Sequence, residues 1–307
     1  MILCCGEALI DMIPPSAGGD GFVPHPGGAV FNTAIALGRL NVPVGLLTGL
    51  STDMFGDQLR DALAASNVDA TLAIPSDRPS TLAFVKLVEG LASYSFFDEN
   101  SAGRMLTKAD MPPLPDGITT LFFGGISLAC EPCADAYAHL LHTEGAERVV
   151  MIDPNIRPGF IEDEARYRAR LTAMLAAADI VKVSDEDLDW ITGKDQPMED
   201  KANELLAQGP GIVVVTRGSS GATCFTNSND PVHVDAKVTQ VVDTVGAGDT
   251  FNAGFLAKLE TGGYLNKSAL SRIKPTMLED TMAFAAKVAA VTVSRAGANP
   301  PFKSELD

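Results

Sequence analysis

A glycine-rich turn in the C-terminal third of the chain reads Asp243-Thr244-Val245-Gly246-Ala247-Gly248-Asp249-Thr250-Phe251. It follows a β-favouring stretch at 238–242 and precedes a helix that apolar periodicity predicts over 250–259. Small residues let the backbone turn tightly, and the amides at a helix N-terminus favour an anion. The turn therefore predicts a strand-to-helix connection whose amides at 246–248 surround a phosphate group.

Asp249 is an acid inside this phosphate-binding turn. A carboxylate beside a phosphate is unfavourable unless it has a chemical task, and accepting the proton of an attacking hydroxyl is such a task. The alternative is an ordinary helix start in which an Asp or Thr caps the first turn. The full nine-residue string favours the catalytic interpretation.

Compact apolar runs alternate with helical patterns along most of the chain. We expect buried strands at 2–5, 44–47, 121–123, 149–152, 180–183 and 212–215. We expect helices at 31–40, 56–66, 134–142, 165–177, 201–207, 250–259 and 279–294. Continuous apolar strands fit a parallel sheet covered on both faces, so the alternation predicts a doubly wound α/β fold.

Two segments interrupt that alternation. The segment 12–26 is rich in Pro and Gly, and 81–97 contains two extended stretches around Glu89-Gly90, with Gly90 as the expected hairpin turn. We expect both to form a small sheet that acts as a lid. The sequence has no long linker, so we expect one domain over 1–307 with lid segments at about 12–26 and 79–100. Apolar edges and faces on such a sheet predict a homodimer formed through the lid.

The composition excludes several classes of protein. A formal net charge of −16 over 307 residues argues against a nucleic-acid partner, which needs a basic surface. The apolar runs are too short to cross a membrane, and no signal peptide is apparent at the N-terminus. Five cysteines are an odd count that suits a reducing compartment. We therefore expect a cytoplasmic protein without a membrane partner.

The glycine-rich turn resembles the C-terminal signature of the ribokinase-like, or PfkB, carbohydrate kinases. Further segments match that family in order: Pro26-Gly27-Gly28-Ala29-Val30-Phe31-Asn32-Thr33-Ala34, Gly49-Leu50-Ser51-Thr52-Asp53-Met54-Phe55-Gly56-Asp57, Asp153-Pro154-Asn155-Ile156-Arg157 and Thr216-Arg217-Gly218-Ser219-Ser220-Gly221. The resemblance spans essentially the whole chain. It implies a ribokinase-like three-layer α/β/α fold with a mostly parallel central sheet and a small β-sheet lid.

The resemblance also implies roles for individual residues. On the catalytic side it assigns Asp249 as the base and the amides of Gly246, Ala247 and Gly248 as the anion hole, with Arg157 as a phosphate-binding candidate. The sugar-binding candidates are Asp11, Gly28, Asn32 and Asn155. The nucleotide-binding candidates are Ser184, Thr216, Gly218 and Gly221. For Arg157 a surface salt bridge is an equal alternative, and the nucleotide-side residues could form a generic turn.

Two metal positions follow from the same resemblance. The family often carries an Asn-x-x-Glu motif that organises Mg²⁺, and the matching stretch is Ser184-Asp185-Glu186-Asp187. It replaces the Asn and keeps an acid at Asp187, which would reach Mg²⁺ through water. Asp243 matches a position beside a monovalent-cation site, which suggests K⁺. Pro301 offers no side-chain oxygen there, which weakens that second expectation.

The implied reaction is ATP-dependent phosphorylation of a primary hydroxyl of a monosaccharide. Fructose is the first expectation, because Asp153–Arg157 occurs together with Ser93-Tyr94-Ser95-Phe96-Phe97-Asp98-Glu99-Asn100, as in bacterial fructokinases. The alternatives are a 2-keto-3-deoxygluconate kinase, another sugar or nucleoside kinase, and a catalytically silent sugar-binding regulator. An acidic sugar calls for a second cation, for which Arg104 is the nearest candidate, and a regulator has no need of Asp249.

Other signals carry less weight. Cys130 and Cys133 have redox-motif spacing, but a chance pairing is the simpler interpretation. The four histidines show no metal-ligand grouping, and the chain has no Gly-x-x-x-x-Gly-Lys-Ser/Thr loop. Gly6 after the first strand lacks the Gly-x-Gly-x-x-Gly run that a Rossmann dehydrogenase would carry.

Overall fold

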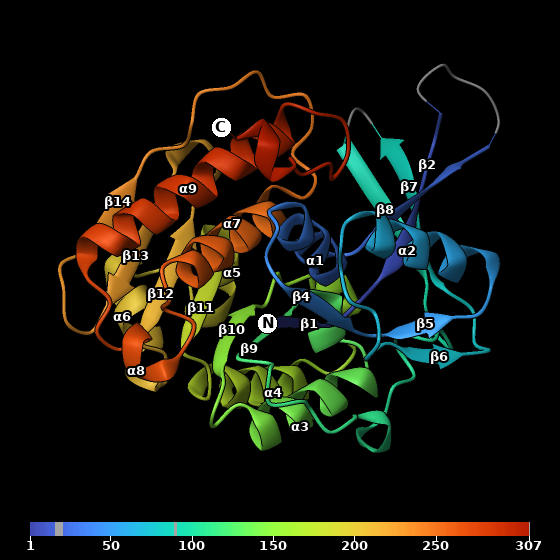
Figure 1. The fold of residues 1–307 in the computed structure, drawn as a ribbon, viewed down its shortest axis with the longest axis horizontal. Coiled ribbons are helices and arrows are strands. Elements are labelled where there is room, and N and C mark those ends of the chain that lie inside the picture. The colour runs from blue at the N-terminus through green and yellow to red at the C-terminus, as the bar shows by residue number, and fades with distance from the viewer. Residues whose placement is uncertain (16–20, 89–90, 307) are drawn as a thin grey trace.

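An eight-stranded sheet forms the centre of the protein (Figure 1). The structure is a computed structural model that describes residues 1–15, 21–88 and 91–306. The strands lie in the order β14-β13-β12-β11-β10-β9-β1-β4, and the last six of these are parallel. Their bounds are β14 Val232–Val234, β13 Ala222–Thr226, β12 Ile212–Thr216, β11 Ile180–Ser184, β10 Val149–Asp153, β9 Thr120–Gly124, β1 Ile2–Cys5 and β4 Val44–Leu47.

Helices cover both faces of this sheet. Side chains alternate between the faces along each strand, so a strand that is apolar throughout exposes apolar side chains on both faces unless helices cover them. Ile2 and Cys4 pack in one buried cluster, while Leu3 and Cys5 pack in the other. The first cluster is covered by α1 Ala29–Arg39, α7 Ala247–Thr261 and α9 Pro275–Val293, with α2 Met54–Ala65 at its edge. The second is covered by α3 Cys133–Glu144, α4 Glu164–Ala176, α5 Asp185–Thr192 and α6 Met198–Gln208. This is the predicted three-layer α/β/α arrangement.

One expected strand is absent from the region before α7. The stretch 238–242 forms no strand, and Val238, Val241 and Val242 are exposed. Its β-favouring side chains find no partner strand, since β14 ends the sheet at Val234. The amides of Val242 and Asp243 instead donate to the carbonyl of Val293, where α9 ends. That contact brings the turn before α7 close to the C-terminal segment.

A separate four-stranded sheet lies beside the N-terminal half of the central sheet (Figure 1). Its order is β3-β2-β7-β8, with bounds Val23–Gly27, Leu9–Ile13, Thr81–Val88 and Leu91–Phe97. This confirms the predicted small sheet, and Asp11 lies within β2. The expected hairpin turn at Gly90 lies outside the described residues. A two-stranded pair, β5 Gly49–Ser51 with β6 Ile74–Ser76, connects the two regions.

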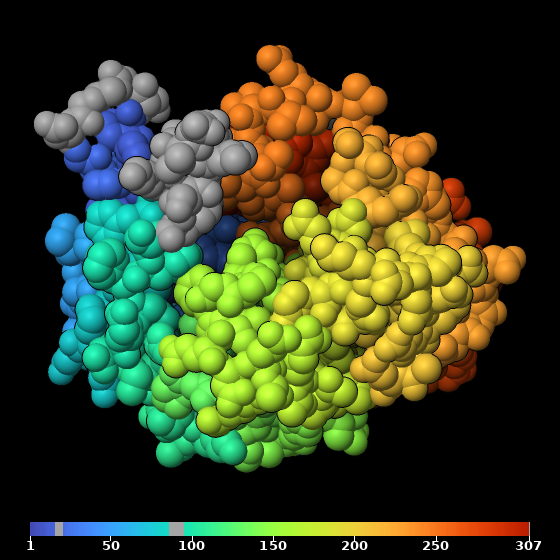
Figure 2. All heavy atoms as spheres, turned by 180° about the vertical axis from the view of Figure 1, so that it is seen from behind, coloured from blue at the N-terminus to red at the C-terminus, as the bar shows by residue number. Residues whose placement is uncertain are grey.

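The carboxyl ends of the parallel strands and the N-termini of α1 and α7 meet at one edge of the molecule. Figure 2 shows that the surface is hollowed there, between segments from the N-terminal, middle and C-terminal parts of the chain. Ligands of open α/β sheets bind at this edge. No helix in the described parts of the chain combines the length and apolar character needed to cross a bilayer.

Candidate active site

The glycine-rich turn forms the start of α7, as the sequence predicts. Gly246 caps the helix in the left-handed conformation with φ 76°, and a Cβ there would lie 2.8 Å from Cβ of Ala298. Backbone amides in the first turn of a helix have no carbonyl four residues earlier within that helix. The amides at Gly248 and Asp249 are therefore placed to bind an anion that approaches the helix N-terminus.

Asp249 lies in this first turn and is buried. Nδ2 of Asn32 donates to Oδ2 of Asp249 over 2.9 Å, and Oγ1 of Thr33 donates to the Asp249 carbonyl over 3.2 Å. Asn32 belongs to the first turn of α1, which packs against α7. The structure thus joins two predicted site residues that are 217 positions apart.

The surroundings of Asp249 raise its pKa to about 7. Burial is the largest cause, and the carboxylates of Asp153 and Glu7 act in the same direction. The hydrogen bond from Asn32 and the charge of Lys182 oppose the rise. A carboxyl group with a pKa near neutrality can accept a proton from an attacking hydroxyl and release it afterwards.

The sugar-side candidates lie where the small sheet meets α1. Gly28 caps α1 with φ 106°, and its carbonyl accepts from the amide of Asn32 over 2.8 Å. A Cβ on Gly27 would lie 2.3 Å from Oδ2 of Asp11, so a side chain at position 27 would displace that carboxylate. Burial raises the pKa of Asp11 to about 6. Three predicted residues, Asp11, Gly28 and Asn32, therefore border one region.

An aromatic pair closes this region and was not predicted. Phe96 of β8 and Phe160 have ring centroids 4.4 Å apart in an edge-to-face contact. Phe96 is aligned with Ala83, and Ala83 is aligned with Asp11 across β7, so Phe96 and Asp11 lie on the same face of the small sheet. Phe160 ends the short segment Pro158–Phe160, directly after Arg157.

The segment after β10 holds two further candidates. Asn155 is half-buried and adopts a left-handed backbone with φ 42°, a conformation that Asn tolerates better than most residues. Arg157 is exposed, and its Nη1 donates to the carbonyl of Ile156 over 3.0 Å. The expected surface salt bridge of Arg157 is not found among the described residues. Its guanidinium is thus available to a phosphate.

A buried ion pair lies beneath the turn, and the sequence interpretation missed one of its members. Nζ of Lys182 lies 2.9 Å from Oδ2 of Asp153, and Nδ2 of Asn252 donates to the same oxygen over 2.7 Å. A Cβ on Gly248 would lie 3.2 Å from that Nζ. The missed signal was a lysine inside the apolar run of β11, since an unpaired lysine is rarely buried.

The nucleotide-side candidates lie at neighbouring strand ends. Ser184 and Thr216 are aligned at the carboxyl ends of β11 and β12. Gly218 opens a 3₁₀ turn with φ 51°, and Gly221 closes it with φ 81°. A Cβ on Gly221 would lie 2.1 Å from the carbonyl of Val234, which only glycine avoids. The residue before this turn is Arg217, whose buried Nε has no hydrogen-bond partner among the described residues.

The two metal candidates are placed differently. Asp187 is buried in the first turn of α5, where Oγ of Ser184 caps its amide over 3.0 Å and its Oδ1 accepts from the amide of Ile156. Burial, and then the charge of Asp153, raise its pKa. Asp243 accepts from the amides of Val245 and Gly297 over 3.0 and 2.8 Å. It therefore joins the turn to the C-terminal segment.

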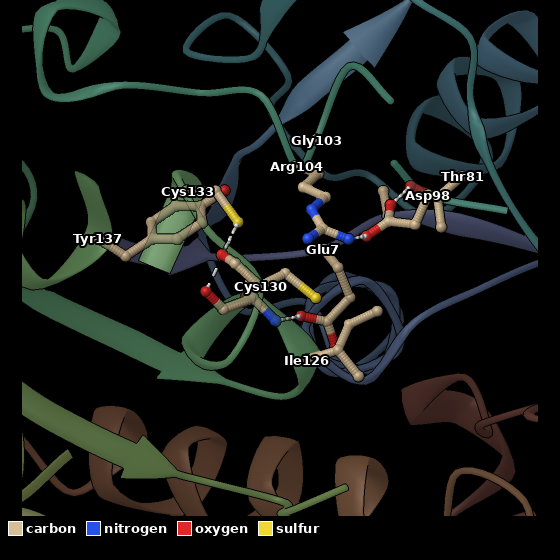
Figure 3. A pocket seen from close by; sticks show the side chains of 11 residues that line it. Glu7, Thr81, Asp98, Gly103, Arg104, Ile126, Cys130, Cys133 and Tyr137 are labelled. Carbon is tan, nitrogen blue, oxygen red and sulfur yellow. Dashed lines mark hydrogen bonds and ion pairs between the residues drawn. The ribbon is translucent and has the colours of Figure 1, made fainter. Parts of the chain in front are cut away.

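The discounted cysteines are buried structural residues. Cys130 and Cys133 are free thiols, and burial raises the pKa of each, so neither has the exposed thiolate of a redox motif. They line the pocket of Figure 3, which also contains Glu7, Asp98 and Arg104. In the described parts of the chain, no group of three or more His, Cys, Asp or Glu side chains could hold a metal by itself.

Comparison with known proteins gives one consistent family. The model of the pfkB family carbohydrate kinases matches residues 1–305. A fructokinase of Rhizobium leguminosarum bv. trifolii is 50% identical over 282 residues, which are 91% of this chain and 86% of that protein.

Solved structures agree over almost the whole fold. A fructokinase from Xylella fastidiosa with bound ATP has a TM-score of 0.89 and 29% identity, covering 99% of this chain and 96% of the other. A double mutant of a Vibrio cholerae O395 fructokinase, bound to fructose, ADP and potassium ion, has a TM-score of 0.84 and 26% identity, covering 97% and 93%.

Proposed function

Because the chain belongs to the PfkB family of carbohydrate kinases, we propose that it is a fructokinase that transfers the terminal phosphoryl group of ATP to a primary hydroxyl of fructose. The observation that carries this proposal is Asp249, a buried carboxyl group with a pKa of about 7 at the N-terminus of α7. A sugar-binding regulator would not need a base in that position.

In the proposed reaction, Asp249 takes the proton of the attacking hydroxyl. The amides of Gly246, Gly248 and Asp249 stabilise the negative charge of the phosphoryl group during transfer. The amide of Ala247, which the motif also assigns to the anion hole, donates to the carbonyl of Thr244 over 3.3 Å. Asn32 orients the carboxylate of Asp249 through the 2.9 Å hydrogen bond. Water is kept out by the aromatic contact between Phe96 and Phe160. Positioning and charge stabilisation together account for most of the rate enhancement in reactions of this kind.

The binding roles divide along the same edge of the sheet. Asp11, Gly28, Asn32 and Asn155 bind the sugar, and the carboxylate and amide side chains among them suit its hydroxyl groups. Ser184, Thr216, Gly218 and Gly221 bind the nucleotide, and Arg157 contacts its phosphates. The two groups meet at Asp249, so the transferred phosphoryl group lies between them.

The residues near the ion pair fit a hydrated Mg²⁺ brought with ATP. Oδ1 of Asp153 and Oδ1 of Asn252 are buried acceptors without a partner among the described residues. The buried carboxyl group of Asp187 is close enough for the charge of Asp153 to raise its pKa. Mg²⁺ keeps several waters and few protein ligands, so such acceptors would hold its waters. When bound, Mg²⁺ neutralises phosphate charge. Asp243 would similarly support a K⁺ site between the turn and the C-terminal segment.

The pairing of Arg104 favours a neutral sugar over 2-keto-3-deoxygluconate. Nη2 of Arg104 is 2.7 Å from Glu162, and its Nε donates to the carbonyl of Glu131 over 3.0 Å. The pocket that Arg104 lines also contains the buried carboxylates of Glu7 and Asp98 (Figure 3). A substrate carboxylate would find this cation already engaged by Glu162 and by the carbonyl of Glu131.

The direct test is ATP consumption over a panel of fructose, ribose, 2-keto-3-deoxygluconate and nucleosides. We expect the largest kcat/KM with fructose, and fructose 6-phosphate as the product by NMR. A larger kcat/KM with 2-keto-3-deoxygluconate or a nucleoside would contradict the substrate assignment. Absence of turnover with every acceptor would contradict the kinase proposal itself.

The remaining parts of the proposed function are the association of two chains and the compartment in which the protein acts. We infer that two copies associate through the small sheet, where Phe22, Val23 and Phe97 are exposed. The protein acts in the cytoplasm, where ATP is available and where all five of its cysteines stay reduced, in agreement with their free thiols.

A further inference from the structure

Lys182 occupies an unfavourable position for a charged residue. It lies within β11 between Val181 and Val183, both fully buried, and its own side chain is 6% exposed. Removing an ammonium and a carboxylate from water costs more than their attraction returns unless the geometry is good. Here Asp153 supplies the partner at 2.9 Å, and Asn252 supports the same carboxylate oxygen. An arrangement of this cost calls for a functional explanation.

The ammonium of Lys182 lies against the phosphate-binding turn. A Cβ at Gly248 would come within 3.2 Å of Nζ, and that contact comes from a side chain rather than from backbone. Asn252 is four residues after Gly248 and therefore one turn further along the same side of α7. The ammonium group of Lys182 is thus held between the ends of β10 and β11 and the first turn of α7.

The charge balance of the region is negative without Lys182. The buried carboxylates of Asp153 and Glu7 both raise the pKa of the buried Asp249. The other buried cations of the described residues are engaged elsewhere, Arg170 with Glu131 and Lys201 with Asp189. Lys182 is therefore the buried cation that a transferring phosphoryl group would meet at this turn.

We propose that Lys182 is a catalytic cation of phosphoryl transfer, which Asp153 and Asn252 hold against Gly248 so that its ammonium contacts the transferring group. This inference rests on the proposed kinase function. In the step, the bond from the terminal phosphorus to the bridging oxygen of ADP breaks and a bond to the sugar oxygen forms. The hydroxyl proton passes to Asp249. Lys182 donates hydrogen bonds to the transferring group throughout.

The first test replaces Lys182 by Met, which keeps a similar length without the charge. We expect kcat to fall about 10²-fold or more, as for the loss of a transition-state donor, with the fructose KM changed only a few-fold. Lys201→Met is the matched control, because Lys201 is equally buried and also pairs with an Asp, at 2.6 Å. That variant should lose stability and keep kcat. Wild-type kcat in Lys182→Met would overturn the inference.

A double variant separates catalysis from folding. Lys182→Met leaves the carboxylate of Asp153 buried and unpaired, so it could lose activity by unfolding. Lys182→Met with Asp153→Asn removes both charges and should recover thermal stability, while its kcat stays below that of Asp153→Asn alone. Recovery of near wild-type kcat would show that Lys182 only neutralises Asp153, and the inference would fail. An inactive wild type would instead overturn the kinase function on which the inference rests.

The pH profile gives an independent readout. The groups that act on Asp249 are Asn32 from α1, Glu7 before β2, Asp153 from β10 and Lys182 from β11. Lys182 lowers the pKa of Asp249 and Asp153 raises it. The acidic limb of kcat/KM should therefore move to higher pH in Lys182→Met and to lower pH in Asp153→Asn. Shifts in the same direction, or no shift, would count against the proposed placement of the charge.

Discussion

Asp249 combines two properties that the proposed chemistry needs, a buried carboxyl group and a hydrogen bond that fixes its direction. Burial raises its pKa to about 7, so it is ionised only above neutral pH. The profile of kcat/KM reports ionisations of the free enzyme. We therefore expect kcat/KM for fructose to rise with pH and to level off above about 7.

Replacing Asp249 by Asn should remove that base and leave the shape of the site intact. The side chains have nearly the same size, and the amide oxygen of Asn can still accept from Asn32. We expect kcat to fall about 10²–10⁴-fold, the usual contribution of a general base, with the fructose KM within a few-fold of wild type. A coupled assay measures this directly. Turnover near the wild-type rate would exclude Asp249 as the base.

The same substitution should stabilise the fold at alkaline pH. An unfolded Asp ionises near pH 3.9, whereas the folded Asp249 keeps its proton up to about 7. Between these values the folded state binds a proton that the unfolded state has released, so this group's contribution to stability falls as pH rises. Asp249→Asn should therefore be more stable than wild type at pH 8, by up to about 4 kcal/mol. The difference should shrink towards pH 4, and thermal unfolding at both values checks this.

The residue types of the site could be predicted from the sequence, but their partners could not. Asp249 and Asn32 were both assigned from their motifs, while the hydrogen bond between them joins segments 217 positions apart. Lys182 and Phe160 were missed, because neither belongs to a glycine-rich or acidic motif. The role of each depends on a contact with a segment far away in the sequence: Lys182 pairs with Asp153, and Phe160 packs against Phe96.

At the scale of elements, the start of α7 depends on a left-handed glycine. Gly246→Ala would place a Cβ in that conformation and 2.8 Å from Cβ of Ala298. We expect a loss of about 1–3 kcal/mol in stability together with a lower kcat, since the amides of the turn would shift. Gly117→Ala is a suitable control, because it has open space and no left-handed backbone. Equal denaturant midpoints for the two variants would contradict this account of the turn.

The sequence predicted the positions of strands correctly where the whole strand is buried. The six apolar runs all became parallel strands, because each is covered by helices on both faces. The stretch 238–242 also favours extended backbone, with three valines, but it has no neighbouring strand to pair with. Composition expresses a preference for extended backbone, whereas a strand also needs a partner, and the partner depends on topology.

At the scale of the whole molecule, the small sheet has two different faces. One carries Asp11 and Phe96 towards the site. The other is apolar: Phe84 contacts Phe22 at 4.9 Å and Phe97 at 5.4 Å between ring centroids, and Phe22 and Phe97 are 45% and 59% exposed. The sequence predicted both the sheet and its apolar character. Which face turns outward depends on the register of β7 and β8, which a sequence pattern leaves open.

Exposed aromatic side chains on a flat sheet favour association with a second copy, since burial of each ring removes apolar surface from water. We expect a wild-type mass of two chains of 32.2 kDa by light scattering at micromolar concentration. Phe97→Asp should give a single-chain mass, because a buried unpaired carboxylate would oppose the contact. Val238→Asp adds the same charge at a fully exposed position away from the small sheet and should remain dimeric. A single-chain mass for wild type would contradict the dimer, and a two-chain mass for Phe97→Asp would place the interface elsewhere.

The fructose KM of Phe97→Asp tests whether association also holds the small sheet over the sugar. If the partner chain steadies this sheet, the separated chain should bind fructose more weakly and show a higher KM.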